Sequence, residues 1–146
     1  IQVDCPFTAL EKILKHHQLG KDVDAIFVEV HGEATSEKMA LAHNFDGRIS
    51  ALIGTHTHVP TADGRIFPQG TAYLTDAGMC ADYNSVIGMK SQNAIARFLN
   101  TDTKPPLTPA ENEATLCGVI LDIDNAGKCN KISQLIIGPH LKNSTL

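Results

Sequence analysis

The 146-residue chain is 42% hydrophobic with a net charge of -4, so we expect a single domain that buries roughly 70% of the surface of the unfolded chain. The acidic balance excludes a broad basic surface for binding nucleic acid or anionic membranes, and no apolar run approaches the roughly 20 residues that cross a bilayer. The four cysteines form no Cys-x-x-Cys pair, which favours reduced thiols and a cytoplasmic protein.

The first third of the chain predicts alternating helices and strands. Residues 6–18 have apolar side chains at helical spacing after a proline, and residues 24–31 form an apolar run typical of a buried strand covered by helices. Residues 34–47 predict a second helix, with Thr35 or Ser36 as its N-cap and a glycine after its last turn. Residues 48–56 predict another apolar strand.

This strand–helix–strand order predicts an α/β fold with a βαβ core. In such sheets, ligands collect beyond the carboxyl ends of the strands. His31 ends the first predicted strand, and His56 ends the second. Both histidines are therefore expected at the same edge of the sheet.

The rest of the chain predicts two hairpins, a helix and a connector. Residues 64–78 form a predicted hairpin around a Pro-Gln-Gly turn, and residues 91–100 predict a helix. The prolines of residues 101–109 exclude a helix there. Residues 114–124 and 129–137 predict a final hairpin around the turn Asn-Ala-Gly-Lys.

Histidines mark the candidate site. His56 and His58 are two residues apart, and on an extended backbone such side chains point to the same side, about 6.5 Å apart along the strand. With His31, they offer three neutral nitrogen donors, enough for one zinc ion with an open position for water. A binuclear site also needs carboxylates. Nearby acids are Glu29, Glu33, Asp63 and Asp76.

Several longer motifs then resemble one family in order and spacing. The stretches VEVHGEATSEK, DGRISALIGTHTHVPTADGRI, GTAYLTDAGM and SVIGM resemble the bacterial YmdB-type metallophosphoesterases of the calcineurin-like superfamily. The resemblance implies a β-sandwich flanked by helices in an α/β/β/α arrangement. It also implies two divalent metal ions, iron or manganese with zinc as the alternative, that hydrolyse phosphodiesters or phosphomonoesters, cyclic nucleotides among them.

Carried over by motif, the resemblance implies metal ligands at His31, His56 and His58. Thr55 and Thr57 are candidates to orient these ligands by hydrogen bonds. In the family, further ligands and a catalytic histidine come from an N-terminal half, so we expect residues 1–146 to be the C-terminal part of one metallophosphoesterase domain. The sequence opens without a methionine, which fits that expectation. The catalytic general acid is then expected outside this chain, which alone is expected to be inactive.

Two alternatives remain open on the sequence. One is a mononuclear zinc hydrolase built from His31, His56 and His58, and the other is a non-catalytic structural or interaction domain. For a partial domain we expect exposed apolar sheet surface. We therefore expect either a homo-oligomer or association with the N-terminal half.

Overall fold

Two sheets and three helices make up the part of the chain that the computed structural model describes, which is residues 4–99 and 104–144. In chain order the elements are α1 (Pro6–Leu14), β1 (Phe27–His31), α2 (Thr35–Asn44), β2 (Ala51–Thr55), β3 (Arg65–Ile66), β4 (Ala72–Leu74), α3 (Ser91–Phe98), β5 (Leu116–Ile123) and β6 (Cys129–Ile137). The end of the predicted helix at residue 100 and the start of the predicted connector at 101–103 lie outside the described residues.

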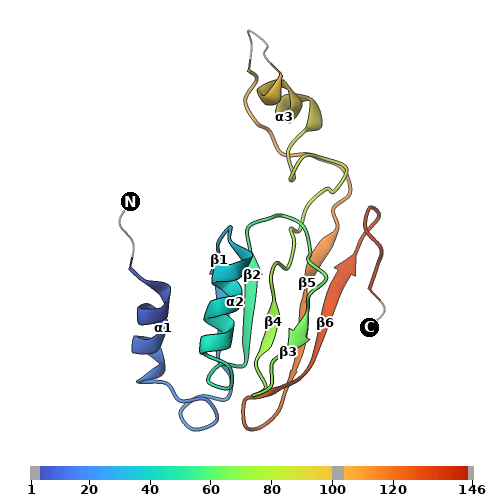
Figure 1. Cartoon of the computed structure of the whole chain (residues 1–146). Coiled ribbons are helices and arrows are strands. Elements are labelled where there is room, and N and C mark those ends of the chain that lie inside the picture. The colour runs from blue at the N-terminus through green and yellow to red at the C-terminus, as the bar shows by residue number, and fades with distance from the viewer. Residues whose placement is uncertain (1–3, 100–103, 145–146) are drawn as a thin grey trace.

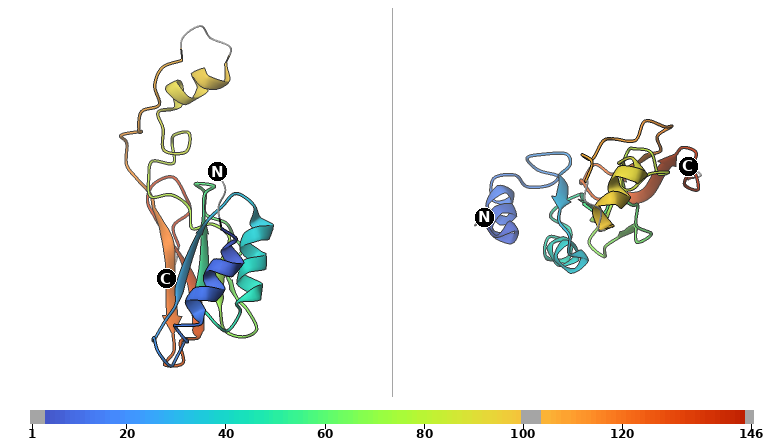
Figure 2. Two further views of the ribbon diagram at one scale, coloured as in Figure 1. Left: turned by 90° about the vertical axis from the view of Figure 1, so that its left-hand side faces the viewer. Right: turned by 90° about the horizontal axis from the view of Figure 1, so that it is seen from above.

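The predicted βαβ core and both hairpins are confirmed. The first sheet has the strand order β1-β2-β4-β3, in which β1, β2 and β4 run parallel and β3 is antiparallel to β4. Strands β5 and β6 form a separate antiparallel sheet. Helices α1 and α2 lie on one side of the larger sheet and the β5–β6 hairpin on the other (Figure 1, Figure 2).

Alternating side chains of the central strands build a core on each face of the sheet. Leu52 of β2 and Tyr73 of β4 point toward α1 and α2, where they pack with Leu14 and Phe45. The neighbouring residues of these strands point the other way and pack beneath the hairpin, as Ile53 does. The period of two in a strand thus assigns each residue to one of two layers.

Three details differ from the sequence-based expectation. Helix α1 ends at Leu14 rather than at residue 18, because no apolar side chain follows until Leu19. Neither Thr35 nor Ser36 is the N-cap of α2; the cap is Ala34, which makes no side-chain hydrogen bond. Strand β1 is covered on one face only, and Phe27 remains 55% exposed, because the hairpin packs over β2 and β4 but not over β1.

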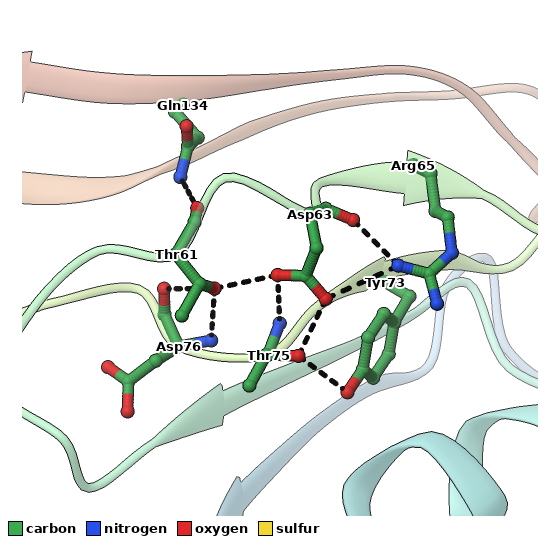
Figure 3. A network of polar contacts seen from close by, with 7 residues as sticks. All are labelled: Thr61, Asp63, Arg65, Tyr73, Thr75, Asp76 and Gln134. Carbon is green, nitrogen blue, oxygen red and sulfur yellow. Dashed lines mark hydrogen bonds and ion pairs between the residues drawn. The ribbon is translucent and has the colours of Figure 1, made fainter. Parts of the chain in front are cut away.

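A polar network ties the loop before β3 to the end of β4 (Figure 3). Asp63 accepts hydrogen bonds from the hydroxyl groups of Thr61 and Thr75 at 2.7 and 2.6 Å and forms an ion pair with Arg65. Burial raises the pKa of Asp63, but the hydrogen bonds from Thr75 and Thr61 outweigh it and hold the pKa below its ordinary value. Gln134 of β6 donates to the carbonyl of Thr61, so the network also joins the two sheets.

Helix α3 and its flanking segments extend away from the sandwich (Figure 1). The helix exposes apolar side chains, including Phe98 at 87% exposure. None of the helices in the described part of the chain is long and apolar enough to cross a membrane.

The contact of β2 with β4 predicts that Gly54→Ala is strongly destabilising. A Cβ atom at Gly54 would lie 1.9 Å from the backbone oxygen of Thr75 and 2.7 Å from Cδ of the buried Lys38. The backbone must move to relieve this clash. We therefore expect a loss of about 3 kcal/mol in the free energy of unfolding, measured by urea denaturation. Gly118→Ala in β5 is the matched control, because its Cβ would meet nothing within 4 Å. Equal stability of the two variants would contradict this packing.

Candidate metal centre

Parallel pairing brings the candidate ligands to one edge of the sheet. In the register of β1 and β2, His31 lies opposite Thr55, and both residues are the last of their strands. His56 follows directly. Residues 25 apart in the sequence therefore become neighbours through backbone hydrogen bonds alone.

A chain of hydrogen bonds selects one tautomer of the neutral His31 ring. The Thr55 hydroxyl donates to a carboxylate oxygen of Glu29, so it accepts from Nδ1 of His31, 2.9 Å away. The ring proton is then on Nδ1, and Nε2 keeps its lone pair. This is the tautomer in which Nε2 can bind a metal ion, held by a hydroxyl group and a carboxylate.

The spacing of two imidazole nitrogens fits a shared ion. Nε2 of His31 lies 3.3 Å from Nδ1 of His56, and the rings meet edge to face. Two nitrogens that are each about 2.1 Å from one ion at a tetrahedral angle are about 3.4 Å apart. Without an ion, the same spacing allows a hydrogen bond from His56 to the lone pair of His31. Both rings are exposed, so an ion could reach them.

His58 does not join this pair. Its Nδ1 lies 3.3 Å from the carbonyl oxygen of Ile87. The expected extended backbone is also wrong: φ is +136° at His56 and +64° at His58, so the chain bends and the two rings do not project in parallel. Among residues 4–99 and 104–144, no three or more His, Cys, Asp or Glu side chains form a group that could hold an ion.

The nearby acids have separate roles. Glu29 is linked to His31 through the hydroxyl of Thr55. Asp63 belongs to the polar network before β3, and Glu33 is exposed before α2. Asp76 is buried and accepts from the backbone N–H of Thr57 at 2.7 Å. Sequence reasoning considered Asp76 as a possible ligand and missed this contact. Its position just after β4, the next parallel strand, was the available signal.

The two candidate threonines differ in what they contact. Thr55 bonds to the His31 ring. The hydroxyl of Thr57 instead donates to the carbonyl of Val59 at 3.1 Å. Of the two, Thr55 is therefore the threonine placed to orient a histidine ring.

Comparison with known proteins shows the family of the chain. Residues 1–135 match the model of a family described as YmdB-like protein. The chain belongs to this YmdB-like family. It is 45% identical over 136 residues to a Bacillus subtilis protein named 2',3'-cyclic-nucleotide 2'-phosphodiesterase, covering 92% of this chain and 50% of that protein. It is 42% identical to a putative phosphatase/phosphodiesterase of Mycoplasma pneumoniae, covering 77% of this chain and 40% of the relative.

Solved structures show the same fold for this YmdB-like chain. A novel phosphatase from Mycoplasma pneumoniae matches with a TM-score of 0.83 at 36% identity, over 94% of this chain and 48% of that one. A hypothetical protein from Thermus thermophilus matches with a TM-score of 0.80 at 41% identity, over 94% and 52%. The chain thus spans about half the length of the relatives it matches.

The hydrogen-bond chain to His31 predicts the effect of Thr55→Val. Loss of the hydroxyl removes about 1 kcal/mol of preference for the Nδ1–H tautomer, or about fivefold in the tautomer ratio. The ratio can be measured from the ring ¹⁵N chemical shifts of His31 by NMR. Thr57→Val is the control of equal shape and should leave the His31 shifts unchanged. An unchanged tautomer ratio in Thr55→Val would contradict the assignment.

Proposed function

We propose that this chain supplies histidine ligands to a binuclear, metal-dependent phosphoesterase that hydrolyses phosphodiesters or phosphomonoesters. The observation that carries the proposal is the 3.3 Å separation of His31 Nε2 and His56 Nδ1 at the carboxyl edge of two parallel strands. The names of the relatives support a phosphoester substrate, and that of the Bacillus protein supports a cyclic nucleotide. The proposed cofactors are two ions of iron or manganese, with zinc as the alternative.

In this proposal the residues of the chain bind and orient. His31 and His56 share one ion, and His58 serves the other after a turn of its ring away from Ile87. Divalent ions at such sites polarise phosphoryl oxygens and activate water as the nucleophile. Glu29 and Thr55 keep the lone pair of His31 directed at His56. The carboxylate ligands and the general acid come from the remainder of the full-length protein.

A cavity of mixed charge lies beside His31. It measures about 530 Å³ and lies between the chain before α1, the end of β1 and the first turns of α2. Its charged lining residues are Lys38, Asp4 and Glu37. Lys38 is 1% exposed with its Nζ 3.4 Å from the carbonyl of Thr55, so it stabilises the end of β2.

The mononuclear zinc alternative receives less support. It requires three imidazoles around one ion, whereas His58 is bonded to Ile87 and, of the three, His31 and His56 are within reach of each other. The non-catalytic alternative predicts no bound metal. Substitution of one proposed ligand separates the metal-dependent enzymes from the non-catalytic alternative, and the number of ions bound by the unmodified protein separates the two enzymes.

The substitution His56→Ala tests the function in the full-length protein. We expect it to lower metal affinity and the hydrolysis of a 2',3'-cyclic nucleotide together, each by more than about 100-fold, because even the partners of ligands contribute about 10- to 100-fold. Metal content is measured by elemental analysis and turnover by product release. His16→Ala, an exposed histidine after α1, is the control. Full turnover in His56→Ala would reject the assignment.

Exposed apolar side chains support association of the isolated chain. Within the described residues, β1 pairs only with β2 and β5 only with β6, so each has an open edge. Phe27 and Ile120 on these strands are 55% and 45% exposed. Open edges with apolar side chains favour pairing with another chain. We propose a homo-oligomer, or association with the remainder of the full-length protein.

Light scattering checks this association. For residues 1–146 alone we expect a mass of at least twice the 15.7 kDa of one chain, lowered by the double variant Phe27→Ser and Ile120→Ser. A monodisperse species of the unmodified chain at the mass of one chain would contradict it.

A further inference from the structure

The carboxylate of Asp76 links the loop that carries His56 and His58 to the backbone that follows β4. Asp76 is 1% exposed. Its Oδ2 accepts from the backbone N–H of Thr57 at 2.7 Å, and its Oδ1 accepts from the backbone N–H of Gly78 at 2.9 Å. A buried carboxylate that accepts two N–H groups makes charge-assisted hydrogen bonds, which are among the stronger ones in proteins.

The backbone of Asp76 is anchored separately from its side chain. Its N–H donates to the hydroxyl of Thr61 at 2.9 Å, and its carbonyl accepts from the N–H of Thr61 at 3.1 Å. Figure 3 shows the carboxylate directed away from Thr61 and Thr75. The network therefore holds the main chain and leaves the carboxylate to reach the histidine loop.

That loop has an unusual backbone. Positive φ values at His56 and His58 flank Thr57, and such conformations in non-glycine residues persist only where surrounding contacts impose them. The hydrogen bond of Asp76 is made to the residue between the two. This hydrogen bond is thus placed to hold the positive φ values of both His56 and His58.

We propose that Asp76 is a positioning residue: its carboxylate holds the Thr57 N–H and thereby directs His56 and His58 toward the metal ions. The proposal rests on the proposed function. It assigns Asp76 a role distinct from that of a ligand, because its side chain is buried and directed at two backbone N–H groups. The bond holds the backbone from which both side chains project, and the ring of His58 then turns from Ile87 to reach its ion.

The test compares two aspartates in the metal-free and the Mn²⁺-loaded full-length protein. We expect Asp76→Asn to weaken Mn²⁺ binding, measured by calorimetry, by about 10- to 100-fold. We also expect it to shift the ring NMR signals of His56 and His58 before metal is added. Asp46→Asn is the matched control, since Asp46 also accepts two backbone N–H groups, from Gln69 and Thr71, at the opposite end of β4 from Asp76. It should lower thermal stability and leave Mn²⁺ affinity within about threefold, well below the loss typical of partners of ligands.

A second variant covers a failure of Asp76→Asn to fold. Replacement of the Thr57 peptide N–H by an ester oxygen removes the same hydrogen bond and keeps both side chains, and it should weaken Mn²⁺ binding in the same direction. Unchanged affinity in either folded variant overturns the positioning role. Absence of Mn²⁺ binding in the unmodified protein overturns the proposed function instead.

Discussion

The parallel register of β1 and β2 is the constraint on which the candidate site depends. It places His31 opposite Thr55, and that single pairing brings an imidazole, a hydroxyl and, one step further along the chain, a second imidazole to the same edge. The backbone ladder is buried between two packed layers at β2. A slip by one residue would turn Ile53 and Leu52 to the wrong cores, so the packing of the sheet also protects the geometry of the site.

Two groups of hydrogen bonds orient the histidines that the strand register brings together. Glu29 and Thr55 orient the ring of His31 from the strand side, and Asp76 holds the backbone of the loop from the side of β4. In each group a carboxylate accepts a hydrogen bond from this chain: Glu29 from the Thr55 hydroxyl and Asp76 from the Thr57 N–H. In the proposed binuclear centre, this chain would supply imidazole nitrogens that carboxylates hold in place. Ligands from elsewhere in the full-length protein would then balance the positive charge of the two ions.

Much of the fold could be predicted, because its signals are local. The βαβ core, the two hairpins and helix α3 follow from periodicity and turn residues, and family motifs agreed with them. The errors concern packing between distant parts. Phe27 was expected to be buried because its strand is apolar, but its exposure depends on where the β5–β6 hairpin lies. The last residue of α1, Leu14, and the N-cap of α2, Ala34, were missed for a different reason. Both depend on local contacts that periodicity does not resolve.

By itself, the sequence determined the class of fold and the family of the chain. It also determined that His31 and His56 end neighbouring parallel strands. These results follow from the order of residues along the backbone. The tertiary structure alone decided that His31 meets His56 at 3.3 Å, that His58 turns toward Ile87, and that Asp76 binds the histidine loop. Those facts depend on φ angles that no pattern of polar and apolar residues encodes, and on hydrogen bonds between residues 19 to 29 positions apart.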